Sequence, residues 1–421
     1  MAPIPSFQTA RYKLLIENIS YMGALQVFNI IFPLLSYGFL IRILGSELFG
    51  LIVFAQSLIG YLILVIDFGF NMSATRQVSM HRDDPEILSE IVSSVFVIKT
   101  FLTVISIIIF LLCLNFIPQA DNYKLLFILS LWSCFSSLLF AQWYFQGIEQ
   151  MKYIAVLTLI SRSFFFMMIF LVVTGPEDYL LIPLLYGFGA LISGVASIFV
   201  IFKQHNVKFR FPGFKRLHYY VNDSLPMFLA SAAGSLHTNS GKVILGLSVG
   251  MTSVAYFDLA EKLLNLLRTP LNVVSQVIYP RNAKDRDISF IRRAFDFTFG
   301  FNVILLIVFL LVLDIIIFYI AGPSMLAAIP IVKILSSMLL LSTICGFLGI
   351  QILCAFGYAK DFSTGTIASS AMFIACISLL YSLNLVTASS IALATVVSEI
   401  AIIAILISKL RKYDLLRPLF N

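Results

Sequence analysis

Long apolar runs recur along the whole sequence, and they constrain the fold more than any other feature. A membrane-spanning helix needs about 20 consecutive, mostly apolar residues. Runs of that length predict about 12 spans, which cover residues 19–44, 48–70, 89–117, 123–145, 153–173, 179–202, 224–248, 252–279, 294–320, 327–356, 362–384 and 387–409. We therefore expect an all-α integral membrane protein for which lipid is the main solvent.

The composition agrees with a membrane protein and gives no sign of an enzyme. The chain is 60% hydrophobic and 12% charged, whereas soluble proteins are roughly 45–50% apolar and ~25% charged. The five cysteines lie in apolar runs without metal-ligand spacing, and the four histidines are dispersed. Neither a GxxxxGK[ST] nor an HExxH motif occurs. The sequence thus predicts no enzymatic activity, no metal and no cofactor.

The basic residues predict how the chain crosses the membrane. Of the 28 Lys and Arg residues, only Arg42 and Lys124 fall in odd-numbered loops, and most of the others lie in even-numbered loops and near the ends. Positive charge remains on the cytoplasmic side. Both termini are therefore expected in the cytoplasm, and the net charge of +7 indicates topology and not nucleic-acid binding.

A basic segment near residues 203–222 divides the chain into two six-helix bundles, predicted at 1–205 and 206–421. The stretch LGSELFG from residue 44 resembles LSVGMTS from residue 247, each followed by an amphiphilic span and a basic end. Parallel repeats of this kind usually place the substrate path between the halves. We expect two such bundles around a central lumen.

Ionisable residues inside spans are costly and therefore mark candidate functional groups. The basic ones are Lys99, Arg162, Lys242, Lys262, Arg268 and Lys333. In the eighth span, Asp258 lies four residues before Lys262, and Glu261 lies seven before Arg268, so each pair shares a helical face. Two interpretations stay open: local neutralisation of these pairs, or a polar cavity wall on which Lys262 and Arg268 meet an anion.

Lys242 and Arg162 have no acid within one helical turn in sequence, so another helix, water or a ligand must supply their partner. We place both on the lumen as anion-binding candidates. Lys99 is expected to extend towards the cytoplasm, because it lies one turn inside its span. Asp67 either anchors an inner turn near Arg76 or takes part in proton or sodium coupling.

Several segments resemble one bacterial family. The stretch YFQGIEQMKY from residue 144 is similar to a signature that follows the fourth span of bacterial polysaccharide transporters. RILGSELFG from 42, DFGFNMSATR from 67 and YFDLAEKL from 256 resemble the same family. This is the Wzx-type O-antigen flippase group, which shares a superfamily with multidrug exporters and lipid II flippases.

The resemblance implies a V-shaped pair of six-helix bundles that flips undecaprenyl-pyrophosphate-linked oligosaccharide to the periplasmic leaflet of the bacterial inner membrane. It further implies a coupling ion, either proton or sodium, and contact with membrane lipids and other polysaccharide-assembly proteins. Basic residues in a cavity would bind the pyrophosphate. Because nothing basic lies between Lys13 and Arg42, an O-antigen type repeat unit is favoured over lipid II.

Two other functions remain open on the sequence alone. An ion-coupled multidrug or metabolite exporter of the same superfamily would favour an acidic lumen, which the intramembrane cations oppose. A membrane-embedded polysaccharide polymerase would need a long outer loop, and the predicted outer loops, such as IPQAD and TGPEDY, are short.

Overall fold

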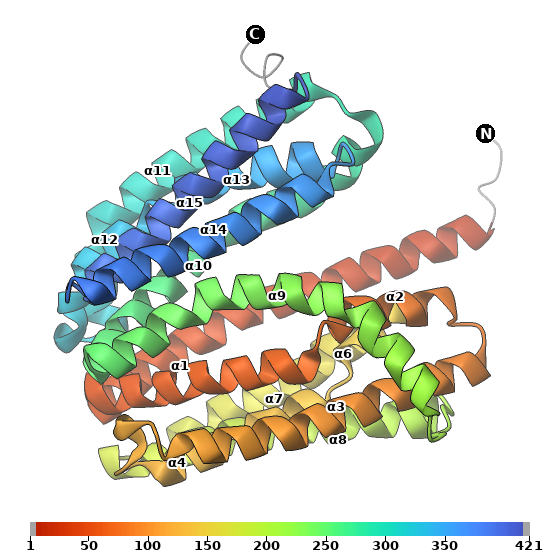
Figure 1. Cartoon of the computed structure of the whole chain (residues 1–421), viewed down its shortest axis with the longest axis horizontal. Helices are drawn as coiled ribbons and strands as arrows, with labels where there is room; N and C mark the ends of the chain where they lie inside the picture. The colour runs from red at the N-terminus through yellow and green to blue at the C-terminus, as the bar shows by residue number, and fades with distance from the viewer. Residues whose placement is uncertain (1–5, 416–421) are drawn as a thin grey trace. The chain divides into compact units, whose positions relative to one another are not determined.

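Throughout the part of the chain that the structure describes, the regular elements are helices. The computed structural model describes residues 6–415, apart from some side chains of α1, α9 and α10, and these residues contain no β-strand (Figure 1). The hydrocarbon interior offers no water to pair with backbone N–H and C=O groups, and a helix satisfies them within its own segment. An all-α membrane protein, as the sequence predicted, is confirmed.

The helices fall into an earlier and a later set along the chain. The earlier set is α1 (Ser6–Asp67), α2 (Phe70–Met80), α3 (Pro85–Leu114), α4 (Lys124–Ser130), α5 (Trp132–Leu139), α6 (Gln142–Gly147), α7 (Met151–Val172) and α8 (Leu181–Phe199). The later set is α9 (Phe214–Ser248), α10 (Met251–Asp285), α11 (Ile288–Ala321), α12 (Ile329–Ser336), α13 (Met338–Gly346), α14 (Ala359–Ser382) and α15 (Ala388–Lys412). Short 3₁₀ and π segments extend α8, α12 and α13.

Within the described residues, nine helical segments are long and apolar enough to cross a membrane. The helices α9 and α10, each 35 residues long, are not among them because they carry more polar and charged side chains. These two helices coincide with the predicted spans 224–248 and 252–279. The total of about 12 spans therefore stays a prediction.

The chain divides into two compact units. Unit 1 comprises the chain up to Ile43 together with Ala55–Ala232, and unit 2 comprises Leu44–Phe54 and the chain from Ala233 onwards. The boundary thus lies inside α9, later than the predicted 205/206. The first half of α9 belongs to unit 1 because its Ser224 hydroxyl lies 2.6 Å from that of Ser73 in α2.

The two resembling stretches at residues 44 and 247 each contain a glycine with positive φ: Gly45 forms a kink inside α1, and Gly250 directly precedes α10. Gly45 has φ 78° and ψ 165°, and Gly250 has φ 134° and ψ 164°. Residues with a Cβ rarely adopt this combination, so glycine is the residue type suited to both turns. Each glycine is followed directly by a long helix, which agrees with an internal repeat.

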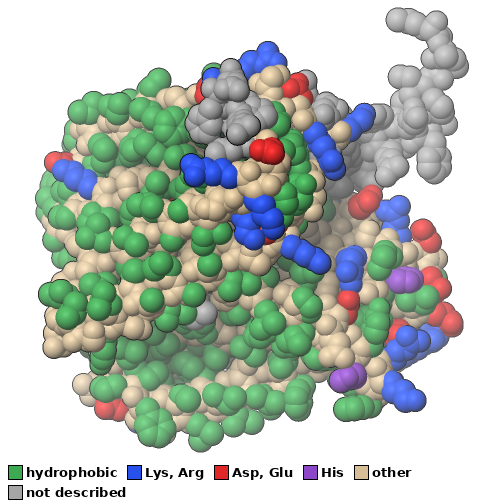
Figure 2. All heavy atoms as spheres, turned by 45° about the horizontal axis from the view of Figure 1, so that its top comes forward, with side chains coloured by type: hydrophobic (Ala, Val, Ile, Leu, Met, Phe, Trp, Pro, Cys, Tyr) green, Lys and Arg blue, Asp and Glu red, His purple; other side chains and the backbone are tan. Residues whose placement is uncertain are grey.

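Many large hydrophobic side chains of the described residues are exposed. Figure 2 shows many hydrophobic side chains on the visible face. Exposed large hydrophobic residues include Phe101, Leu171 and Leu311. Apolar patches of this extent are not found on soluble monomers, and they match helices that face lipid.

Candidate functional site

The fourth predicted span is a broken helix. Residues 124–147 form α4, α5 and α6 in succession, and the chain leaves the helical conformation at Phe140 (φ −83°, ψ 99°). The hydrogen bond that would join the N–H of Ala141 to the carbonyl of Ser137 is absent from the part of the chain described. The carbonyl of Ser137 and the N–H of Ala141 therefore lack their usual helical partners inside a membrane-spanning segment.

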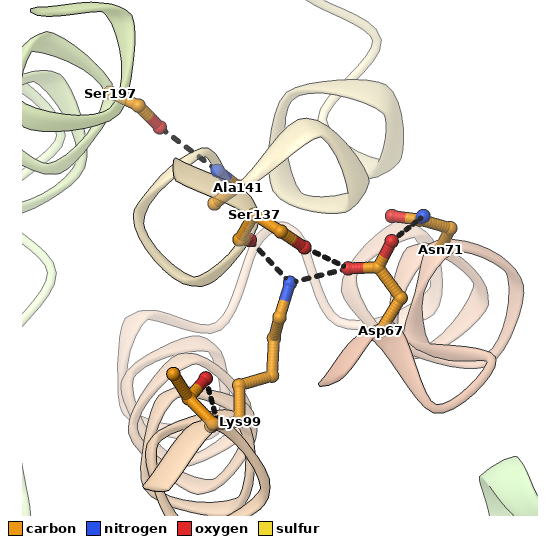
Figure 3. A network of polar contacts seen from close by, with 7 residues as sticks. Asp67, Asn71, Lys99, Ser137, Ala141 and Ser197 are labelled. Atoms are coloured by element: carbon orange, nitrogen blue, oxygen red, sulfur yellow. Dashed lines mark hydrogen bonds and ion pairs between the residues drawn. The ribbon is translucent and has the colours of Figure 1, made fainter. Parts of the chain in front are cut away.

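Side chains from neighbouring helices satisfy both of these groups, as Figure 3 shows. The N–H of Ala141 donates to the hydroxyl of Ser197 on α8 at 3.1 Å. The carbonyl of Ser137 accepts from the ammonium of Lys99 on α3 at 2.7 Å. Irregular backbone at membrane depth is tolerated only where protein groups or a water-filled cavity compensate for it.

The same ammonium pairs with an acid from a third helix. The Nζ of Lys99 lies 2.8 Å from Oδ1 of Asp67, the last residue of α1, and the hydroxyl of Ser137 donates to that oxygen, also at 2.8 Å. The other carboxylate oxygen accepts from the amide of Asn71 at 3.4 Å. The Lys99 side chain is 2% exposed. The expectation that Lys99 extends towards the cytoplasm is therefore wrong.

Asp67 does not pair with Arg76 either. The guanidinium of Arg76 forms an ion pair with Asp223 on the first half of α9. Gln77 on α2 donates to the other oxygen of Asp223 at 3.1 Å. The alternative in which Asp67 anchors an inner turn near Arg76 is thereby replaced by a pair with Lys99.

A polar cavity of about 210 Å³ opens beside Asp67 within unit 1. Its wall comes from the end of α1, the start of α2, α5, the break before α6, and α8. The lining residues are Ile63, Asp67, Asn71, Ser133, Ser136, Ser137, Phe140, Gln142 and Tyr186. We call this the Asp67 cavity.

Two of the four stretches that resemble the family, DFGFNMSATR and YFQGIEQMKY, pack against each other in unit 1. Gly147 of the QG signature lies so close to α2 that a Cβ there would come within 2.6 Å of the Val78 side chain. Thr75 of α2 donates to the carbonyl of Trp143 at 3.1 Å. The hydroxyl of Tyr144 lies 3.0 Å from Nδ1 of His205, and burial lowers the pKa of His205 below its ordinary value.

In unit 2, two lysines and two acids form a cluster between α9 and α10. The ammonium of Lys242 lies 3.3 Å from Asp258 and 2.8 Å from Glu261. Lys262 lies 3.0 Å from the other oxygen of Asp258, as its spacing of four residues predicted. The cluster is neutral overall, and Glu261 pairs with Lys242 instead of reaching Arg268.

Arg268 belongs to a second polar chain in unit 2. Its guanidinium donates to the hydroxyl of Ser342 on α13, and that hydroxyl donates to Glu399 on α15 at 3.4 Å. The Nε of Arg268 is buried and has no hydrogen-bond partner among the described residues. The arginine is thus only partly satisfied by the protein.

Arg162 on α7 differs from the other three predicted cations. Its side chain is half-buried, and no hydrogen bond or ion pair joins it to any residue that the structure describes. Residues 162, 166 and 170 share one helical face. On that face Phe166 stacks on Phe32 of α1 with ring centroids 5.0 Å apart, and Phe170 lies 4.3 Å from Phe39. Arg162 therefore lies one turn from an aromatic contact with α1.

The sequence singled out the charged residues but not the groups around Asp67. The pairs Asp67–Lys99 and Lys242–Glu261 join different helices, so spacing along the chain gave no sign of them. One signal was available for the cavity. Ser133, Ser136 and Ser137 follow the spacing of one helical face within an otherwise apolar span.

Comparison with known proteins identifies the family. The family model described as "Polysaccharide biosynthesis protein" matches residues 15–284. A putative O-antigen transporter of Escherichia coli (strain K12) is 25% identical over 84% of this chain and 86% of its own length. A putative O-antigen transporter of Shigella dysenteriae is 28% identical over 64% of this chain and 67% of its own.

Solved structures share the fold at low sequence identity. The lipid II flippase MurJ in an inward closed conformation has a TM-score of 0.79 and 15% identity, with 96% of this chain and 90% of that chain covered. An inward-facing multidrug resistance MATE transporter of the MOP superfamily has a TM-score of 0.73 and 12% identity, with 91% and 95% covered. Because the family model matches more than half of its residues, this chain belongs to the polysaccharide biosynthesis protein family, and its fold is that of the MurJ and MATE structures.

Proposed function

We propose that this protein is a flippase for lipid-linked oligosaccharides. It moves undecaprenyl-pyrophosphate-linked repeat units of O-antigen type from the cytoplasmic to the periplasmic leaflet of the bacterial inner membrane by alternating access. The family match, the two putative O-antigen transporters and the fold shared with the lipid II flippase MurJ support this function. Translocation breaks no covalent bond, so it requires binding groups and no catalytic ones.

One observation carries the proposal further than the comparisons do. Arg162 lies in an apolar helix and is half-buried, yet no described residue neutralises it. A charge inside a membrane is costly unless it is paired, so such a residue marks a ligand path. A pyrophosphate is the anionic group that a lipid-linked sugar presents, and a guanidinium binds phosphate oxygens through two parallel hydrogen bonds. Arg162 is therefore the first contact that we assign to the pyrophosphate.

The other cations differ in how readily they can meet an anion. Arg268 retains a buried Nε without a described partner, so it can add one donor. Lys242 and Lys262 are held by Asp258 and Glu261. They become available only when an acid of the cluster is protonated. The cluster is thus our candidate for coupling a proton gradient to substrate binding.

Complementation in a flippase-deleted strain tests the function. Wild type, Arg162→Ala and Lys242→Ala would be compared at matched membrane expression, with surface glycan as the readout. Wild type should restore surface glycan, and Arg162→Ala should lose most of it because the pyrophosphate loses its counter-charge. Lys203→Ala is the matched control, since Lys203 is an exposed cation beyond the last turn of α8. Equal glycan in Arg162→Ala and Lys203→Ala would contradict the assignment.

The runner-up is an ion-coupled multidrug or metabolite exporter, which the MATE transporters of the same fold favour. An exporter of cations would use Asp258 and Glu261 as substrate ligands. It would protect cells from cationic drugs without restoring glycan in the same strain. Drug resistance without restored surface glycan would therefore favour the exporter over the flippase.

A further inference from the structure

We infer that the Asp67 cavity is a subsite for one sugar ring of the translocated oligosaccharide. The inference rests on the proposed function and adds to it, because it separates the place that binds sugar from the cations that bind pyrophosphate. Four features of the cavity support it: the broken helix, the unused polar groups, the charge balance and the size.

The break in the fourth span lies in the cavity wall. Phe140 and Gln142, on either side of Ala141, both line the cavity. Substrate sites in membrane transporters typically form where a spanning helix is discontinuous. Here the freed groups of Ser137 and Ala141 are already satisfied by Lys99 and Ser197 (Figure 3). The backbone groups at the break therefore need no ligand as a partner.

Several polar side chains of the wall have no partner in the protein. Ser133, Ser136 and Gln142 make no side-chain hydrogen bond to any residue that the structure describes. Hydroxyls and a carboxamide each offer donors and acceptors. Sugar hydroxyls also donate and accept, so these groups match a sugar better than they match a purely anionic or cationic ligand.

The charge balance of the cavity excludes the pyrophosphate as its occupant. Asp67 is the only charged residue in the lining, so the wall offers a pyrophosphate no cation to bind. Lys99 compensates that charge from within the protein, with its side chain 2% exposed. The carboxylate still offers acceptor positions to hydroxyls, and a hydrogen bond to a charged acceptor is stronger than a neutral one. A neutral, hydroxyl-rich ligand fits these conditions.

The size of the cavity, which is open on one side, suits a single ring. A volume of about 210 Å³ is below the ~300–1,000 Å³ of pockets for drug-sized ligands. Tyr186 adds an aromatic face that an edge-to-face contact with Phe165 holds in place, at a centroid distance of 5.6 Å. Such a ring can cover the apolar face of a pyranose.

Intrinsic fluorescence of the purified full-length protein tests the inference. The chain has two tryptophans, and Trp132 and Trp143 are sequence neighbours of Ser133 and Gln142. Methyl glycosides of hexoses and N-acetylhexosamines would be titrated as probes. We expect a saturable change in emission with at least one glycoside. Gln142→Ala and Ser136→Ala should each weaken that binding by about threefold to tenfold, the effect of one lost hydrogen bond.

Two controls separate this result from the proposed function. Arg162→Ala should bind the glycoside as wild type does, and inorganic pyrophosphate should not compete. The surface glycan assay with Arg162→Ala tests the proposed function, whereas glycoside binding tests the sugar subsite, so either proposal can fail without the other. Absence of a saturable signal with every glycoside, or equal affinity in wild type and Gln142→Ala, would overturn the inference. A signal that only protons or sodium produce would also overturn it and would identify a coupling-ion site.

Discussion

The ammonium of Lys99 on α3 joins two features that the sequence leaves unconnected. It lies 2.8 Å from the carboxylate of Asp67 on α1 and 2.7 Å from the carbonyl of Ser137 on α5. One buried lysine therefore neutralises an intramembrane acid and satisfies a backbone group released by a broken helix. Removing it leaves both groups without their main partner.

We expect Lys99→Met to destabilise the protein by about 3–5 kcal/mol, the usual effect of breaking a buried ion pair by deleting one partner. Methionine fills a similar volume, so the loss reflects charge and hydrogen bonding and not a cavity. Thermal unfolding of the detergent-solubilised protein measures the effect.

The double variant Lys99→Met/Asp67→Asn is the control for that experiment. Removing both charges should recover a large part of the stability, because no uncompensated charge remains. A double variant no more stable than Lys99→Met would show that the ion pair is not the cause.

Close packing at Gly69 predicts a second stability effect. A Cβ at this position would come within 2.6 Å of the backbone nitrogen of Phe228, and Gly69 also has φ +74°. Overpacking typically costs about 1–3 kcal/mol, and the left-handed backbone adds to it for a residue with a Cβ. We expect Gly69→Ala to lower the melting temperature clearly.

Gly300→Ala is the matched control within α11. A Cβ there meets nothing within 4 Å. Alanine favours a helix over glycine by about 1 kcal/mol, so this variant should be neutral or more stable. Equal losses at the two glycines would refute the packing argument.

The distribution of basic residues predicts the orientation of the chain. A reporter that fluoresces only in the cytoplasm should be active when fused to the C-terminus. A periplasmic phosphatase inserted at Gly175, in a loop predicted outside, should be active as well. The opposite pattern of activities would reverse the predicted topology of the whole protein.

The cluster around Lys242 predicts a link between proton binding and transport. In vesicles, we expect an imposed pH gradient to change the translocation rate of the wild type. Glu261→Gln should lose that response, because the partner that lies 2.8 Å from Lys242 can no longer change charge.

Asp83→Asn is the matched control, since Asp83 is 98% exposed outside the spans. It should keep the response to the gradient. If the translocation rate of Glu261→Gln responded to the pH gradient as strongly as that of the wild type, this cluster would not be part of the coupling mechanism.

Much of the fold could be predicted from the sequence because lipid imposes helices on long apolar runs. The turns at Gly45 and Gly250 followed from their glycines. The break at Phe140 could not be predicted, since that stretch is as apolar as a continuous span. The groups that compensate for the break are Ser197 and Lys99, which are distant in sequence from Ala141 and Ser137.

Spacing along the chain indicated the Asp258–Lys262 pair, but it did not indicate the pairs between different helices. Intramembrane charge identified Lys242, Arg162 and Asp67 as candidates. The identity of each partner depends on which helices pack together, and one sequence does not specify that. The position of the unit boundary within α9 likewise depends on contacts made by Asp223 and Ser224.

Translocation by the purified protein in proteoliposomes tests the central claim most directly. The substrate would be a fluorescent oligosaccharide linked to undecaprenyl pyrophosphate, and its appearance in the opposite leaflet would be followed with time. The account predicts transfer by the wild type and a rate at least about tenfold lower in Arg162→Ala, the loss expected for one charge-assisted hydrogen bond. Equal rates in the two proteins, or a wild type that moves only cationic amphiphiles, would contradict it.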